Sequence, residues 1–219
     1  MELEVKEIQL RDQQLELHPY KSVYWKREKT LWVSDLHLGK TNHFQKAGIP
    51  IPDRVSDENW NRLYHILDIY HPEKVLFMGD LFHSSFNIEW EIFGRYLNAF
   101  SPIEYHLIMG NHDILHKEQY LKFGIIMHEE ALLMPPFLFT HHPLKDIPEG
   151  CYNICGHIHP AVRLRGAGRQ GLKVPCYYFG ANQGILPAFG AFTGTAAIKP
   201  NKQDQLYLVV EEQIIPINE

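Results

Sequence analysis

The pattern of apolar and polar positions divides the chain into two halves. In the first half, short runs typical of strands alternate with longer stretches of helical periodicity. Helices are expected at residues 53–70, 88–99 and 118–123, and Asp53 is a residue type that caps helices. The second half carries mostly strand patterns. The expected strands cover residues 2–10, 13–18, 22–25, 30–34, 75–78, 104–109, 125–128, 131–134, 137–140, 152–155, 161–164, 174–179, 206–210 and 213–217.

This order of elements predicts a single α/β domain over residues 1–219. We find no repeat, low-complexity segment or linker that would divide the chain. Two packed mixed sheets flanked by helices would accommodate the number of strands. The segment 184–194 is rich in Gly, Pro and Phe, and is expected to be irregular.

Composition is that of an ordinary globular protein, with 45% hydrophobic and 21% charged residues. The N-terminus lacks the basic and apolar regions of a secretory signal, and the longest near-apolar run, Ala131–Phe139, is too short to span a bilayer. Three cysteines provide no paired framework, which is typical of a reducing compartment. We therefore expect a cytoplasmic protein without a membrane segment.

The net charge of −5 argues against a generally basic nucleic-acid binder, but the charge is unevenly distributed. No acidic residue occurs between Glu149 and Asp204, an interval that carries +6, whereas the rest of the chain carries −11. The basic residues of the interval are Arg163, Arg165, Arg169, Lys173, Lys199 and Lys202.

Five short apolar strands end in side chains that can bind a metal. In α/β sheets, ligands bind at the carboxyl ends of the strands, so these five ends would meet if the strands lie side by side. One such motif alone is often a turn or a surface loop, but five of them at strand ends are hard to obtain by chance. The motifs are Asp35-Leu36-His37, Gly79-Asp80, Gly110-Asn111-His112-Asp113, His141-His142 and Gly156-His157-Ile158-His159.

The candidate ligands are carboxylates, imidazoles and one amide oxygen, with no thiolate. This set suits Mn²⁺, Fe, Zn²⁺ or Ni²⁺ better than a structural cysteine-rich zinc site. Seven such side chains are too many for one ion. Two ions roughly 3.5–4 Å apart, bridged by one carboxylate, would use them all.

The order of these motifs resembles that of the calcineurin-like metallophosphoesterases. The resemblance implies a four-layer α/β/β/α sandwich of two mixed sheets with a dinuclear metal centre. It assigns one ion to Asp35, His37 and His159, the other to Asn111, His141 and His157, and the bridging role to Asp80. His141 is preferred over His142 because it comes first after the strand.

The same resemblance implies phosphoester hydrolysis, with His112 as the catalytic histidine and Asp113 as the group that orients it. We expect His112 to contact a phosphoryl oxygen or to protonate the leaving alkoxide. Asp113 would fix the tautomer of His112, as carboxylates next to metal sites do for histidines.

A narrower likeness is to the bacterial ligase-associated DNA-damage-response phosphoesterases. It is carried by Asp35–Lys40, Phe44, Gly48–Pro52 and Leu186–Gly194, although Gly194-Thr195 replaces the usual Gly-Gly. The likeness implies a DNA endonuclease acting in repair on single-stranded or damaged DNA. Among the candidate metals Mn²⁺ is the first choice, and association with an ATP-dependent DNA ligase and a helicase is also implied.

A basic rim around the site would help to bind such a substrate. Lys40 and His43 follow His37 in the chain, and Arg163 and Arg165 follow His159 on one face of the expected strand 161–165. Phosphate contacts from such residues weaken as salt rises. The other basic residues of the acid-free interval, Arg169, Lys173, Lys199 and Lys202, are expected to be simply solvated.

Two other functions remain open at this point. The same metal centre would suit a small-molecule phosphodiesterase or pyrophosphatase acting on cyclic nucleotides or nucleotide conjugates. The fold also serves as a catalytically inactive scaffold subunit, but such chains typically lose ligands, whereas every motif is intact here. The sequence therefore favours an enzyme.

Overall fold

The computed structural model describes residues 3–39, 54–83, 85–100, 102–165, 171–191 and 193–217, and for residues 54–57 and 165 it describes the backbone alone. The expected helix cap Asp53 lies outside these residues. All three cysteines of the chain, Cys151, Cys155 and Cys176, are free thiols.

The first sheet contains seven strands that follow one another in sequence order. Neighbours from β1 to β4 are antiparallel, and neighbours from β4 to β7 are parallel. Its strands are β1 (Lys6–Leu10), β2 (Gln13–His18), β3 (Ser22–Trp25), β4 (Thr30–Ser34), β5 (Lys74–Met78), β6 (Glu104–Ile108) and β7 (Ile125–His128). Because β4, β5 and β6 are parallel neighbours, their carboxyl ends lie at the same edge of this sheet.

The second sheet is also mixed, with the order β14-β11-β12-β13-β10-β9-β8, and with β15 paired to β12 and β16 to β15. Here β9, β10 and β13 are parallel. Its strands are β8 (Ala131–Met134), β9 (Phe137–Thr140), β10 (Tyr152–Cys155), β11 (Pro160–Arg165), β12 (Gly171–Phe179), β13 (Gln183–Ile185), β14 (Ala196–Ala197), β15 (Gln205–Val210) and β16 (Gln213–Ile217). The expectation that 184–194 is irregular throughout was wrong at its start, where β13 pairs with β10; so short a strand carries too little periodicity to be recognised.

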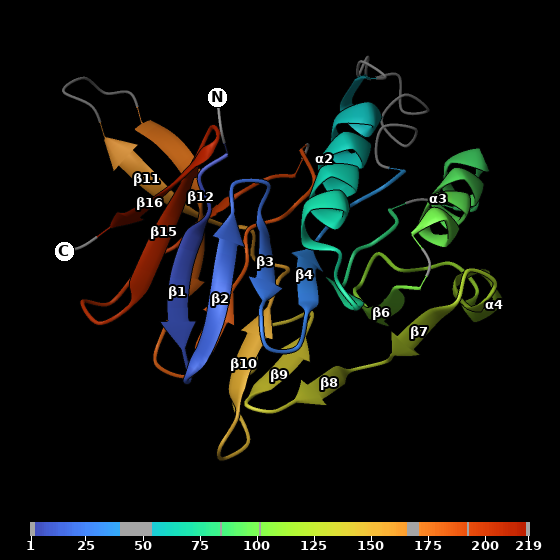
Figure 1. Ribbon diagram of the computed structural model, residues 1–219. Helices are drawn as coiled ribbons and strands as arrows, with labels where there is room; N and C mark the ends of the chain where they lie inside the picture. Colours follow the sequence, from blue (N-terminus) through green and yellow to red (C-terminus); the bar gives the residue numbers. More distant parts are fainter. Residues whose placement is uncertain are drawn as a thin grey trace.

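The helices of the described residues pack against the first sheet (Figure 1). They are α2 (Arg54–Tyr70), α3 (Ile88–Ala99) and α4 (Lys117–Leu121), close to the expected bounds. Asn87 caps α3, because its side chain accepts hydrogen bonds from the N–H groups of Glu89 and Trp90. Among the described helices, none has the length and apolar character to cross a bilayer. The expected α/β fold with two mixed sheets is confirmed. Of the helical layers in the expected α/β/β/α sandwich, the described helices form the one that covers the first sheet.

An aromatic core joins the two sheets. The ring centroids of Trp32 and Phe139 lie 4.9 Å apart, and those of Trp25 and Phe137 lie 5.0 Å apart. Both pairs are packed edge to face. Each such buried ring stabilises the fold by roughly 1.5–3 kcal/mol. The buried hydroxyl of Tyr177 in β12 shares its one proton between two backbone carbonyls of the first sheet, those of His18 at 2.8 Å and Ser22 at 2.9 Å. These contacts fix how the loops that leave the two sheets meet.

Candidate metal centre

The structure brings the five predicted strand ends together. Asp35 and His37 follow β4, Asp80 follows β5, and Asn111, His112 and Asp113 follow β6, all at one edge of the first sheet. His141 follows β9, and His157 and His159 follow β10, at the adjoining edge of the second sheet. Parallel pairing within each sheet and packing between the sheets therefore create one cluster.

One part of the cluster consists of Asp35, His37 and His159. Their potential ligand atoms all lie within 4.8 Å of one another. Oδ1 of Asp35 lies 3.4 Å from Nε2 of His159, and the side chain of Asp35 is completely buried. His37 also faces Asp80, with 3.8 Å between its Nε2 and Oδ2 of that carboxylate.

The other part is built around His141, which is buried. Its Nε2 lies 3.1 Å from Oδ1 of Asn111 and 3.2 Å from Nδ1 of His157. The same nitrogen lies 3.5 Å from Oδ1 of Asp80. The two oxygens of Asp80 thus face different parts of the cluster, Oδ2 towards His37 and Oδ1 towards His141.

The donor set fits divalent cations. Oδ1 of the buried Asp35 has no hydrogen-bond partner among the described residues, whereas Oδ2 accepts from the hydroxyl of Ser34 and from the N–H of His157 at 3.0 Å. A buried carboxylate oxygen without a donor is rare and needs an explanation. Imidazole and carboxylate ligands that converge on such an oxygen suit Mn²⁺, Fe or Zn²⁺.

Left-handed backbone occurs at five of the same residues, and at six other described residues that are not glycine and lie outside the cluster. Left-handed φ values are uncommon for residues other than glycine, and they persist only where the surroundings enforce them, often at functional sites. They occur at Asp35 (51°), His37 (50°), Asp80 (50°), His157 (63°) and His159 (52°). The fold therefore holds these five side chains in orientations that a relaxed backbone would not give.

Gly156 allows the two sheets to approach each other at the cluster. A Cβ atom at this position would overlap the Ser34 hydroxyl and the Asp35 carboxylate. Any larger residue here would displace Asp35, so the glycine that precedes His157 is needed for close approach and not only for a turn.

The electrostatics of the cluster favour the forms that bind metals. Burial alone would raise the pKa of Asp35, but contacts with His159, Ser34 and His141 hold that pKa below its usual value. Burial lowers the pKa of His157, and the neighbouring His142 and His141 lower it further. Ionised carboxylates and neutral imidazoles are the ligand forms.

Asp113 makes different contacts from those expected. Its Oδ1 accepts hydrogen bonds from the N–H groups of Leu81 (2.8 Å) and Phe82 (3.3 Å), and its Oδ2 accepts from the N–H of Gly110 (2.8 Å). Burial raises its pKa to about 6, although these backbone donors oppose the shift. Within the described residues its hydrogen bonds go to the backbone and not to the ring of His112, so Asp113 ties the loop after Asp80 to its own loop.

Two histidines near the cluster, His83 and His142, were given no role from the sequence. The ring of His83 lies 3.9 Å from that of His112 and 5.4 Å from that of His37. His142, which was set aside in favour of His141, forms a possible metal-binding group with His141 and His157. The only sequence signal for His83 is its position three residues after Asp80, which is too common to be informative.

The expected basic rim is described only in part. Lys40, His43 and Arg169 lie outside the described residues, as does the side chain of Arg165, whereas Arg163 is exposed on β11. Lys199 and Lys202 are exposed, as expected. Lys173 is not simply solvated, because its Nζ donates a 3.2 Å hydrogen bond to the carbonyl of Thr195.

Two mixed sheets that gather carboxylates and imidazoles at their adjoining edges define the fold of a metallophosphoesterase. The chain belongs to the calcineurin-like phosphoesterase family, because the sequence model of this family matches residues 28–178. Members of this family are metal-dependent hydrolases that bind divalent ions.

Two solved structures are similar to the chain. The chain is similar to the crystal structure of the nuclease MPE from Pseudomonas putida, with 25% sequence identity, coverage of 98% of this chain and 100% of that chain, and a TM-score of 0.78. It is also similar to a protein of unknown function from Aquifex aeolicus, with 22% identity, coverage of 59% of this chain and 78% of that chain, and a TM-score of 0.43. No curated protein matches the chain.

Proposed function

We propose that this chain is a metal-dependent phosphodiesterase that cleaves DNA strands as an endonuclease. The hydrolytic part of the proposal rests on the position of Asp80, whose Oδ2 faces the imidazole of His37 and whose Oδ1 faces the imidazole of His141. The choice of DNA is supported by the similarity over almost the whole chain to a protein described as a nuclease. We further propose that it works in the cytoplasm as a single domain, in DNA repair beside a ligase and a helicase.

The proposal assigns two divalent cations to the centre, with Mn²⁺ as the first choice. Bound there, such cations would offset phosphate charge and lower the pKa of water. One would be held by Asp35, His37 and His159, the other by Asn111, His141 and His157, with Asp80 between them. The Asp35 oxygen that accepts no hydrogen bond and the left-handed backbone at five of these seven residues support this assignment.

His112 is the proposed proton donor. Its backbone N–H donates a 2.9 Å hydrogen bond to Oδ1 of Asp80, which holds the residue against the centre. The ring can then donate a hydrogen bond to a phosphoryl oxygen or a proton to the leaving oxygen, a role typically worth 10²–10⁴-fold in rate. Asp113 would support this position by holding the loops on either side.

A Mn²⁺-dependent panel of plasmid DNA, single-stranded DNA, cyclic nucleotides and nucleotide diphosphates tests the proposal. We expect strand cleavage, a loss of at least about 100-fold in His112→Ala, and a metal content below two equivalents in Asp80→Asn. Lys202→Ala, which changes an exposed residue away from the centre, serves as the control. Wild-type turnover of bis-p-nitrophenyl phosphate by His112→Ala would remove its proposed role, and hydrolysis of cyclic nucleotides with DNA left intact would replace the substrate.

A further inference from the structure

The β11–β12 hairpin carries two cations directly opposite each other. In the antiparallel register, Arg163 faces Lys173 and Leu164 faces Leu172. Arg163 and Lys173 are exposed on one face, and on the other face Leu164 is 42% and Leu172 67% exposed. Since both faces are open, this part of the hairpin extends beyond the packed sandwich, as its position at the periphery shows (Figure 1).

The charge of this pair is uncompensated. Side chains that face each other across antiparallel strands have Cβ atoms about 4.5–5.5 Å apart, and like charges there are destabilising. No ion pair in the described part of the chain involves Arg163 or Lys173, and no acidic residue occurs anywhere between Glu149 and Asp204. An anion bound between the two side chains would relieve this repulsion.

The pair is linked to the candidate metal centre by a short segment. Nδ1 of His159 lies 2.9 Å from the carbonyl oxygen of Gly194, and Nζ of Lys173 donates to the next carbonyl, that of Thr195, at 3.2 Å. β11 begins directly after His159, and four residues of extended strand cover about 13 Å to Arg163. The cations are therefore near the centre but too far along the strand for Arg163 to reach the same phosphate group as the centre.

The side chains of Arg163 and Lys173 also lie on the same side of the second sheet as the metal centre. Alternate residues of a strand share a face, so Lys173 lies on the face of β12 that carries Tyr177 and Phe179. Those two rings belong to the core between the sheets. Arg163 and Lys173 thus extend the inner face of the second sheet past the core, on the side where the metal centre lies.

We infer that Arg163 and Lys173 form a binding site for the phosphate backbone of a nucleic acid strand, next to the phosphate held at the metal centre. The inference rests on the proposed function and adds the reason why a polynucleotide is preferred. A strand that enters the centre presents further phosphates along its length, whereas a cyclic nucleotide has none to place between these cations. Binding at this site depends on electrostatic attraction to phosphate groups, so it would be strong in low salt and independent of base sequence.

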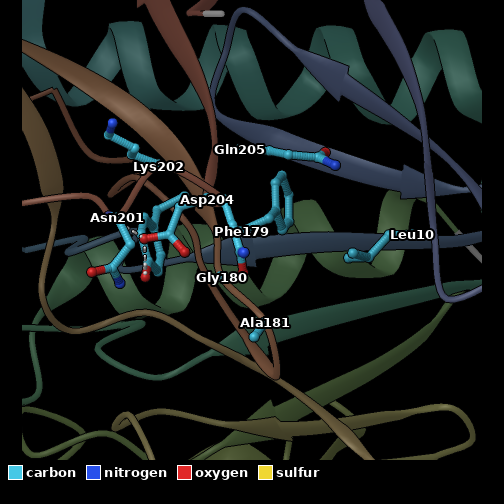
Figure 2. A pocket seen from close by; sticks show the side chains of 10 residues that line it. Leu10, Phe179, Gly180, Ala181, Asn201, Lys202, Asp204 and Gln205 are labelled. Carbon is cyan, nitrogen blue, oxygen red and sulfur yellow. Dashed lines mark hydrogen bonds between the residues drawn. The ribbon is translucent and has the colours of Figure 1, made fainter. Parts of the chain in front are cut away.

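The double variant Arg163→Gln/Lys173→Gln tests the site, with Lys202→Gln as the matched control. Lys202 comes from the same acid-free interval but lies beside a hollow of about 530 Å³ that is also lined by Gly180 and Ala181 (Figure 2). The segment that contains Gly180 and Ala181 adjoins the amino end of β10, because the N–H of Asn153 donates a hydrogen bond to the carbonyl of Asn182. The metal cluster lies past the carboxyl end of the same strand.

Binding of a labelled single-stranded oligonucleotide is measured by anisotropy over a range of salt, with Mn²⁺-loaded enzyme carrying His112→Ala to prevent cleavage. Each lost phosphate contact reduces the slope of log K against log salt by about 0.7, which corresponds to about 5-fold in affinity at 0.1 M salt. We expect the double variant to bind about 25-fold more weakly and the control to bind normally. In the background with His112 intact, the Lys202→Gln control should hydrolyse bis-p-nitrophenyl phosphate at the wild-type rate.

A charge reversal separates binding from folding. Arg163→Glu places opposite charges across the hairpin, so it should raise the midpoint of urea unfolding while weakening oligonucleotide binding more than Arg163→Gln does. Unchanged affinity and salt slope in the double variant would overturn the inference while leaving the proposed nuclease intact. If the wild-type enzyme neither binds nor cleaves polynucleotides, the proposed substrate itself is wrong.

Discussion

Replacing Gly156 by alanine tests whether the proposed centre depends on the close approach of the two sheets. The added methyl group would overlap the hydroxyl of Ser34 and the carboxylate of Asp35, both completely buried. Neither group can move into solvent, so Asp35 must shift. A shift breaks the 3.0 Å hydrogen bond that its Oδ2 accepts from the N–H of His157.

The magnitude follows from two contributions. Overpacking a buried site destabilises by about 1–3 kcal/mol, and loss of a hydrogen bond to a buried charged group adds about 1.5–3 kcal/mol. We therefore expect Gly156→Ala to lower the free energy of unfolding by about 2.5–6 kcal/mol. Because Asp35 is a proposed ligand, the folded fraction should also bind less than two equivalents of Mn²⁺, although every proposed ligand is still present.

Urea unfolding and calorimetric Mn²⁺ titration measure the two effects. Gly194→Ala is the control, because a Cβ there meets nothing within 4 Å and the carbonyl that contacts His159 is retained. The control should stay within about 0.5 kcal/mol of wild type. Wild-type stability and metal content in Gly156→Ala would show that Asp35 is not confined as the structure indicates.

Two further predictions concern buried groups, His18 in β2 and Asp113 at the centre. Burial lowers the pKa of His18 to about 4, and the electrostatic effect of the nearby His65 acts in the same direction. The Nδ1 of His18 accepts a 3.0 Å hydrogen bond from the N–H of Tyr20. As pH falls below about 6.5, the unfolded state therefore binds a proton at His18 before the folded state does, and the folded state loses stability. Between pH 7.5 and pH 5, wild type should lose about 2 kcal/mol more stability than His18→Gln, as measured by urea unfolding. Parallel pH profiles of the two proteins would refute this. Asp113→Ala should weaken Mn²⁺ binding by about 10–100-fold in calorimetry without removing a ligand, since the carboxylate holds the loops that carry Asp80 and Asn111; unchanged affinity would show that those loops keep their positions without it.

The sequence was sufficient to predict the elements and the main candidates of the centre. Period-two and helical patterns are local, so the helices and most strands could be located within a few residues. The end of a strand is local too, and motifs such as Gly79-Asp80 and Gly110-Asn111 are visible without knowledge of the fold. The rule that parallel strands carry ligands at their carboxyl ends then predicted that these residues would meet.

Contacts between distant segments could not be predicted in the same way. The hydrogen bonds of Asp113 to Leu81 and Phe82 span about thirty residues of sequence, and the packing of His83 against His112 has no periodic signal. The register that places Arg163 opposite Lys173 depends on where the β11–β12 hairpin turns. Lys173 was therefore interpreted as an ordinary solvated residue.

By itself, the sequence determined which side chains are available for metal binding and at which strand ends they stand, because both depend on neighbouring residues. Only the tertiary structure decided how they are held. The left-handed backbone at Asp35, Asp80 and His157 occurs where loops from the two sheets meet, and a Cβ at Gly156 has no space because Ser34 and Asp35 of the first sheet lie against it. Strain of that kind is maintained by packing across the whole sandwich, and no local stretch of sequence contains it.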